Sequence, residues 1–202
     1  MYLHRKIKNN NSFFSKIKDL DFILLFCILL LGSISLITMY STDGGQVLFH
    51  TKSHFSKFII FTIFMLLISL LNIKFWFSIS YVAYFLIVGM LVWTINFGVT
   101  ASGSQRWIDL YFINVQPSEL MKIFIILCLA KYFHRKGLEK VNSFYAVIIS
   151  LIIIFLPMSL VIIQPDLGTS LLISVSGILV LWFAGLNHKY FFYSFLITIL
   201  SL

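Results

Sequence analysis

Charged residues, prolines and cysteines are all scarce in this chain of 202 residues. Asp, Glu, Lys and Arg make up 11% of it, whereas 60% is hydrophobic, and its mean hydropathy is +0.99. Such a composition excludes a soluble domain, which would expose large apolar patches to water. Several apolar runs of roughly 18 or more residues are instead long enough to cross a ~30 Å hydrocarbon core as helices. The sequence therefore predicts an all-α, multi-pass membrane protein.

The chain also lacks the residue groupings of several site classes. Cys27 and Cys128 lie within hydrophobic runs, where cysteine serves as a small apolar filler. His50 and His54 are four residues apart but have no acidic or cysteine companion, so we expect no metal site. A nucleotide-binding loop and a nucleophile triad are absent from the sequence. No cofactor is therefore evident, and a need for a divalent cation stays open.

The distribution of the 15 Lys and Arg residues predicts how the chain lies in the membrane. Residues 1–20 form a basic arm, and cytoplasmic segments carry an excess of Lys and Arg. With this arm inside, most other basic residues also fall inside, and only Lys52, Lys57 and Arg106 fall outside. The net charge of +8 then reflects membrane orientation, so we expect no nucleic-acid partner. The N-terminus is predicted to be cytoplasmic.

Apolar runs predict six complete transmembrane helices plus the start of a seventh. The six are expected at about residues 21–41, 55–71, 76–97, 117–133, 143–163 and 165–185. The seventh run begins at Tyr190, and only about 13 residues remain before Leu202, fewer than a span needs. We expect the 202 residues, expressed alone, to be poorly stable and inactive, since later helices would be needed to cover the buried charges.

Residues 98–122 stand out as a polar stretch between two apolar runs. They contain Arg106, Asp109, Glu119 and Lys122. Lipid does not satisfy the backbone of an irregular segment, so this stretch must begin at a water boundary. We expect an exposed loop over residues 98–115 that leads directly into a helix beginning at Pro117.

Charged residues at the starts of two predicted helices are candidates for a site. Glu119 and Lys122 are three residues apart on one helix face, and intramembrane charges usually pair and face the protein interior. Two interpretations stay open: a structural ion pair, or a cavity in which Lys122 meets an anionic ligand.

Asp166 shares a face with Ser170, Ser174 and Gly177, which predicts that it points into the bundle. Its partner could be Arg106 or Lys122.

Arg106 and Trp107 form the third candidate group. Basic and aromatic residues commonly anchor a protein at the membrane interface, which is one interpretation. The other is substrate binding, because an Arg guanidinium suits phosphate oxygens and a Trp ring offers a flat face to a sugar or lipid. From the residues alone, the prediction is an outward-facing polar cavity for an anion.

Three motifs resemble those of the SEDS family (shape, elongation, division and sporulation proteins), in particular its RodA branch. They are GSQRWI at 103–108, QPSELMK at 116–122 and QPDLGTSLL at 164–172. The resemblance implies a ten-helix fold of which residues 21–202 are the N-terminal part. It also implies that Arg106, Trp107, Glu119, Lys122 and Asp166 bind substrate in a central cavity. The aspartate taken as the family's catalytic base lies in a later loop, beyond Leu202.

The function implied by this resemblance is peptidoglycan synthesis. SEDS proteins polymerise lipid II on the outer side of the bacterial cytoplasmic (inner) membrane, releasing undecaprenyl pyrophosphate. They work in cell elongation and division with a class B penicillin-binding protein, a transpeptidase that crosslinks the strands. Besides membrane lipids, lipid II and this transpeptidase are the expected partners. Two alternatives stay open: a translocator of lipid-linked substrates, and a non-catalytic scaffold of the wall-synthesis complex.

Overall fold

The computed structural model describes residues 20–101, 104–110, 113–136, 141–187 and 189–190. Residues 1–19 of the expected basic arm, and the seventh run from residue 191 onward, lie outside the described residues. The chain divides into two compact units, Met1–Asn72 and Ile73–Leu202.

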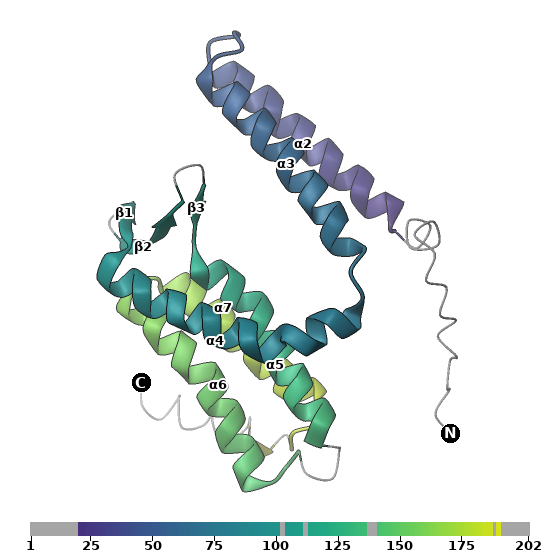
Figure 1. The fold of residues 1–202 in the computed structure, drawn as a ribbon, viewed down its shortest axis with the longest axis vertical. Helices are drawn as coiled ribbons and strands as arrows, with labels where there is room; N and C mark the ends of the chain where they lie inside the picture. Colours follow the sequence, from purple (N-terminus) through teal and green to yellow (C-terminus); the bar gives the residue numbers. More distant parts are fainter. Residues whose placement is uncertain (1–19, 102–103, 111–112, 137–140, 188, 191–202) are drawn as a thin grey trace. The chain divides into compact units, whose positions relative to one another are not determined.

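The first unit is a hairpin of two helices, α2 (Phe22–Thr42) and α3 (Phe49–Ser69), which lie side by side (Figure 1). The α2 helix begins where its apolar run predicts, because the Asp21 carboxylate accepts hydrogen bonds from the backbone N–H groups of Ile23 and Leu24. Gly44 and Gly45 make the turn with positive φ angles of 72° and 76°, a conformation that favours glycine.

The start of the second predicted helix was wrong, since α3 begins at Phe49 and not near residue 55. Asp43 provides the reason: its Oδ2 accepts hydrogen bonds from the backbone N–H of Thr51 at 2.8 Å and from its hydroxyl at 2.7 Å. One of the donors that a helix start leaves free is thereby satisfied. His50 and His54 therefore lie in the helix, and His54 Nε2 is 2.8 Å from the Ser35 hydroxyl. Among the described residues, no group of three or more His, Cys, Asp or Glu could hold a metal ion.

The second unit is a bundle in which α5 contacts each of the other three helices. Its helices are α4 (Ile73–Phe97), α5 (Pro117–Lys136), α6 (Phe144–Ile163) and α7 (Leu167–Phe183). The core is a continuous apolar cluster contributed by all four helices. Its fully buried side chains include Leu91, Met121, Ile125, Leu129, Ile154 and Ile173.

Local capping residues set the helix boundaries in this unit. Pro117 occupies the first position of α5, where its missing N–H costs nothing, and Ser143 caps α6 by accepting from Ala146 N–H. The sixth predicted helix starts later than expected, because α7 begins at Leu167 and not at Pro165. Asp166 is the N-cap, because its side chain accepts a hydrogen bond from Thr169 N–H at 3.1 Å.

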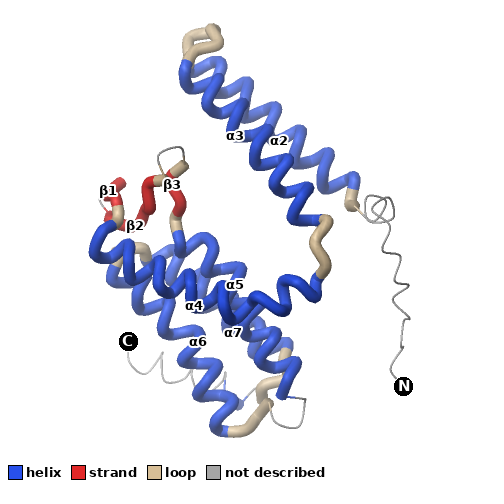
Figure 2. The backbone as a smooth tube through the Cα atoms, viewed as in Figure 1, coloured by secondary structure: helices blue, strands red, loops and turns tan. Residues whose placement is uncertain are grey.

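A small antiparallel sheet replaces the loop expected at residues 98–115. Its strands, in the order β1-β2-β3, are β1 (Val99–Ala101), β2 (Ser104–Asp109) and β3 (Asn114–Val115). Figure 2 shows them in red beside the end of α4 and the start of α5. Val, Thr, Ile and Trp favour extended backbone, and pairing satisfies backbone groups that a loop would leave to water. The predicted all-α class is therefore incomplete, because the fold also contains a three-stranded antiparallel sheet.

Among the described residues, four helices are long and apolar enough to cross a membrane: α2, α3, α4 and α6. The count of six complete spans is not established, because α5 carries charges near both ends and α7 has only 17 residues, about 25 Å of helix. The chain is a multi-pass membrane protein, and apolar side chains cover much of its exposed surface.

The bundle has two ends that differ in their residues. We call the end with β1–β3, Pro117 and Asp166 the strand end. The opposite end contains the start of α4, the last turn of α5 and the start of α6, and we call it the basic end because Lys74, Arg135 and Lys136 lie there.

Candidate functional site

An ion pair between Arg106 and Asp166 lies at the strand end of the bundle. Arg106 comes from β2 and Asp166 from the N-cap of α7, and 2.9 Å separates Arg106 Nη1 from Asp166 Oδ2. The side chains are 25% and 10% exposed. Asp166 points into the bundle, as its helix face predicted, and of the two partners considered it pairs with Arg106.

The Asp166 carboxylate is held by neutral groups as well. Gln116 Nε2 donates to Oδ2 at 3.1 Å, and Thr169 N–H donates to Oδ1 at 3.1 Å. Burial by itself would raise the pKa of Asp166, but the hydrogen bonds from Thr169 and the Arg106 guanidinium more than offset it and lower the pKa. Asp166 is therefore an anion at neutral pH and an acceptor in this site.

Several buried polar atoms at the strand end have no hydrogen-bond partner among the described residues. They are Ser104 Oγ, Arg106 Nε, Ser118 Oγ and Gln164 Oε1. Buried polar atoms are almost always paired, so a group of orphans in one place marks a site where a ligand or another segment supplies partners. The Nε–H of Arg106 is therefore a donor without a hydrogen-bond partner among the described residues.

Gln116 and Gln164 are polar residues of this end that sequence reasoning did not single out. Gln164 is 3% exposed, and its Nε2 donates to the Leu91 carbonyl at 3.0 Å and to the Thr94 hydroxyl at 2.8 Å. It ties α4 to the segment before α7. The signal that could have identified them is the Gln-Pro pair that lies at or just before the start of both α5 and α7 and within two of the family motifs.

Glu119 and Lys122 form a second ion pair within the first turns of α5. Lys122 Nζ lies 2.9 Å from Glu119 Oε1, which confirms the predicted i, i+3 pairing. Glu119 is 54% exposed along its side chain and Lys122 25%. Within the described part of the chain, no hydrogen bond or ion pair joins this pair to Arg106 and Asp166, so the four charges form two separate pairs.

Trp107 lies beside Arg106 on β2, paired in register with Val99 on β1. It is partly buried. Next to it, Gln105 Nε2 donates to the Gly98 carbonyl at 2.8 Å and so fastens β2 to the end of α4. The strand thus holds Arg106 and Trp107 in fixed positions at the strand end.

The small residues of α7 allow the close helix contact that their spacing predicted. Ser170 and Gly177 are buried. A Cβ atom built on Gly177 would lie 2.5 Å from Ile154 Cγ1 of α6, so glycine is what lets the two helices approach. This contact fixes α7, and with it Asp166.

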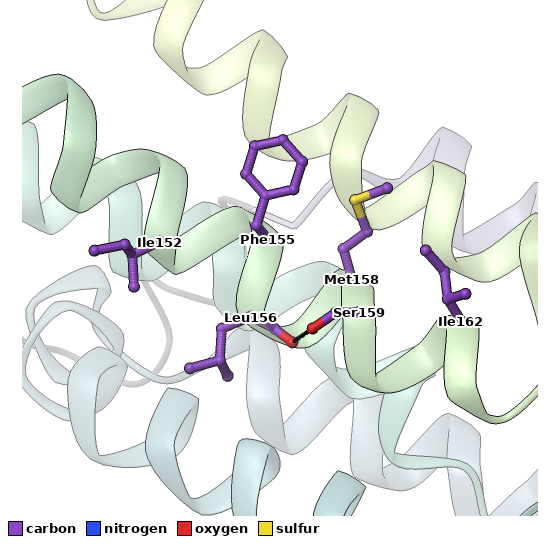
Figure 3. Close-up of a pocket in the computed structure, with 6 residues that line it drawn as sticks. All are labelled: Ile152, Phe155, Leu156, Met158, Ser159 and Ile162. Atoms are coloured by element: carbon purple, nitrogen blue, oxygen red, sulfur yellow. Dashed lines mark hydrogen bonds between the residues drawn. The ribbon is translucent and has the colours of Figure 1, made fainter.

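A shallow apolar hollow on α6 does not belong to this site. Figure 3 shows its lining side chains, all of them from α6. Ser159 is the one polar residue among them, and its hydroxyl donates to the Leu156 carbonyl at 2.9 Å. Because no charged group lines the hollow, it offers nothing that would hold an anion.

Comparisons with known proteins place the chain in a family. The family model for cell cycle proteins of the FtsW, RodA and SpoVE type matches residues 17–202. A probable peptidoglycan glycosyltransferase FtsW of Buchnera aphidicola (subspecies Baizongia pistaciae) is 30% identical over 181 residues, 87% of this chain and 47% of that protein. The peptidoglycan glycosyltransferase MrdB of Escherichia coli K12 is 40% identical over 106 residues, 52% of this chain and 28% of that protein.

The fold has a solved counterpart. A crystal structure of the rod shape determining protein RodA of Thermus thermophilus matches with a TM-score of 0.73 and 20% identity, covering 90% of this chain and 59% of that one. At this identity the likeness shows the fold alone. The chain spans about half the length of the first curated relatives it matches. From the match over residues 17–202, the chain belongs to the FtsW/RodA/SpoVE family of cell cycle proteins, the SEDS family.

Proposed function

We propose that this chain is part of a peptidoglycan glycosyltransferase that polymerises lipid II into glycan strands. The observation that carries the proposal is the Arg106–Asp166 pair with its orphaned polar neighbours, found in a chain whose relatives are named peptidoglycan glycosyltransferases. Arg106, Trp107, Glu119, Lys122 and Asp166 are the proposed substrate-binding residues.

Cations at the strand end suit a substrate that contains pyrophosphate. Arginine forms charge-assisted hydrogen bonds to phosphate oxygens, and Arg106 Nε has no hydrogen-bond partner among the described residues. Lys122, whose side chain is 25% exposed, supplies a second positive charge. In the transition state, negative charge grows on the departing pyrophosphate, and fixed cations stabilise it.

In the proposed reaction, a sugar hydroxyl of one lipid II attacks the lipid-linked anomeric carbon of the growing chain. The new glycosidic C–O bond forms as the bond to undecaprenyl pyrophosphate breaks, and a base takes the hydroxyl proton. We assign no residue of this chain as that base. Asp166 accepts hydrogen bonds from Arg106, Gln116 and Thr169, and it orients the Arg106 guanidinium.

The proposed setting is the bacterial cytoplasmic (inner) membrane, with the N-terminus in the cytoplasm. The concentration of Lys and Arg in residues 1–20 and at the basic end supports this orientation, which puts the strand end outside. Residues 21–202 would then form the N-terminal part of the transmembrane domain. The proposed partner is a class B penicillin-binding protein that crosslinks the strands.

A hybrid protein tests the proposal. Residues 1–202 are joined to the remaining part of the Buchnera FtsW relative, reconstituted in liposomes and given labelled lipid II. We expect glycan polymer from the hybrid and at least a tenfold loss with Arg106→Gln, because the charged contact to pyrophosphate is lost. Arg106→Lys, which keeps the charge, should retain part of the activity.

The same liposomes separate the alternatives. Transfer of lipid II across the bilayer by a hybrid that forms no polymer would favour the translocator. An inserted hybrid that neither polymerises nor moves lipid II, yet still binds the penicillin-binding protein, would favour the scaffold. An Arg106→Gln hybrid as active as its parent would remove Arg106 from the proposed site.

A further inference from the structure

A second feature of the bundle lies near the basic end, away from the Arg106–Asp166 pair. It is an apolar groove of about 400 Å³ formed by α4, α5 and α6. Its lining includes Tyr81, Tyr84, Cys128, Tyr132, Ile153 and Leu156. This volume is in the range of small-molecule sites. We call it the tyrosine groove.

The tyrosine groove opens toward the surrounding lipid. Phe85 and Ile152, which also line it, are 68% and 56% exposed, so an occupant reaches it sideways from the bilayer. The lined stretch of α6 runs from Ile149 to Leu156, about 10 Å of helix, which fits part of a hydrocarbon chain but not a packed helix.

One residue that lines the groove has a buried polar atom without a hydrogen-bond partner among the described residues. The hydroxyl of Tyr84 is satisfied, because it donates to the Ile153 carbonyl at 2.9 Å. The hydroxyl of Tyr132 is buried, yet it makes no hydrogen bond within the described part of the chain. An unpaired buried hydroxyl costs free energy, and a ligand oxygen in the groove would satisfy it.

Basic side chains lie over the two tyrosines nearest the basic end. Arg135 Cζ is 5.9 Å from the Tyr81 ring centre, and Lys136 Nζ is 5.6 Å from that of Tyr132. Buried Lys131 adds positive charge below them, with Nζ 4.6 Å from the Tyr81 ring centre and donating to the Ser78 carbonyl at 2.7 Å. Across the described residues, none of these three cations is ion-paired with a carboxylate.

Cations at the end of a helix also have a simple explanation, because the helix dipole favours them there. That explanation accounts for Arg135 and Lys136 but not for the orphaned Tyr132 hydroxyl or the groove beneath it. An amphipathic anion accounts for all three features, since its chain fills the groove, its charge meets the cations and an oxygen between them accepts from Tyr132.

We propose that the tyrosine groove and the basic last turn of α5 bind an anionic glycerophospholipid of the surrounding membrane. One acyl chain lies along Cys128 and Ile153, an ester or phosphate oxygen accepts from the Tyr132 hydroxyl, and Arg135 and Lys136 meet the phosphate. A lipid-linked wall precursor has similar chemistry, but under the proposed function it binds at the opposite, strand end. Only this choice between lipids rests on the proposed function.

Native mass spectrometry of the full chain in detergent tests the site, with dioleoyl phosphatidylglycerol and dioleoyl phosphatidylcholine as probes. We expect the chain to retain phosphatidylglycerol in preference to phosphatidylcholine. The double change Arg135→Gln and Lys136→Gln should lower this preference about tenfold or more. The control Lys74→Gln removes an exposed charge at the basic end outside the groove, and it should leave binding unchanged.

Two further variants test the groove without disturbing the fold. Tyr132→Phe removes only the orphaned hydroxyl, so it should weaken phosphatidylglycerol binding several-fold without lowering thermal stability in its absence. Ile149→Trp fills the groove and should lower the retention of both lipids. Ile148→Trp is its matched control, because Ile148 is similarly exposed (37% against 40%) but does not line the groove.

Equal retention of the two lipids, or unchanged binding in the double Gln variant, would overturn the proposal. So would full displacement of phosphatidylglycerol by an equal concentration of undecaprenyl phosphate, which would assign the groove to a lipid-linked precursor. Loss of activity by an Arg106 variant of the hybrid that still binds phosphatidylglycerol would show that the two sites are separate.

Discussion

Arg106 and Asp166 connect β2 to the N-terminus of α7 through contact between Nη1 and Oδ2 at 2.9 Å. Asp166 has two roles in this arrangement, because the same carboxylate caps α7 through Thr169 and holds the Arg106 guanidinium. The position of the cation at the strand end therefore depends on the start of a helix that Gly177 packs tightly against α6.

The two roles of Asp166 can be separated by substitution. Asn caps a helix about as well as Asp, so Asp166→Asn should keep the cap and lose the ion pair, whereas Asp166→Ala loses both. We expect the Ala variant to be about 1 kcal/mol less stable than the Asn variant. Denaturant titration followed by circular dichroism in detergent measures the difference. Equal stability of the two variants would mean that the cap contributes nothing.

Asp43 predicts an acid-sensitive contribution to the stability of the α2–α3 hairpin. The hydrogen bond from the Thr51 hydroxyl, and to a smaller extent that from the Thr51 N–H, lowers the pKa of Asp43 below 3.8. A lowered folded-state pKa stabilises the hairpin above about pH 4, and that stability is lost as the pH falls through the folded-state value. The midpoint temperature of thermal unfolding should therefore fall less between pH 6 and pH 3 in Asp43→Asn than in the parent chain.

The comparison has an internal check. Thr51→Val removes the hydroxyl donor but keeps the N–H donor, so its sensitivity to acid should fall between that of the parent and that of Asp43→Asn. An Asp43→Asn variant with the full acid sensitivity of the parent would contradict the assignment.

Lys122→Met should lower the activity of the hybrid far more than its folded yield. Glu119 is half exposed, so water can solvate its carboxylate once the partner is lost, and the structural cost is small. The proposed contact with the substrate pyrophosphate has no such replacement. Polymer yield and the folded fraction from gel filtration are measured together. Parallel loss of both would favour a purely structural ion pair.

Trp107→Ala should weaken the binding of lipid II while the protein still inserts normally. Trp107 is held in register on β2 beside Arg106, where its ring can face a sugar or lipid. Trp93 on α4 is 56% exposed and packs on Phe97 at 4.7 Å between ring centres, so Trp93→Ala is the matched control. Binding to lipid II in nanodiscs is the measurement. Equal effects of the two changes would support the interface-anchor interpretation of Trp107.

Features with strong local signals could be predicted from the sequence. The α2 and α6 helices start within a residue of expectation because Asp21 and Ser143 cap them locally. The Glu119–Lys122 pair follows from its helical spacing. The start of α3 was missed because its acceptor, Asp43, lies several residues upstream across a turn. Such a contact depends on how the turn folds.

Other features depend on tertiary contacts that spacing does not encode. The strands β1 and β3 have only three and two residues, too few for a recognisable alternation, so their sheet was predicted as a loop. Arg106 and Lys122 were equal candidates for Asp166, and only the folded position of β2 decides between them. The roles of Gln116 and Gln164 depend on neighbours far along the chain.

The final prediction concerns the packing that fixes α7. A methyl group at Gly177 would meet Ile154 at 2.5 Å from Cγ1 and 2.8 Å from Cδ1, so in Gly177→Ala either the Ile154 side chain or the two helices must shift. We expect a loss of about 1–3 kcal/mol, as in other overpacked cores. Gly89 on α4 is the matched control, since a methyl group there has nothing within 4 Å. Gly89→Ala should leave stability unchanged or raise it by up to about 1 kcal/mol, because alanine is the better helix former. If the two variants unfold at the same denaturant concentration, the close contact between α6 and α7 at Gly177 does not contribute to stability.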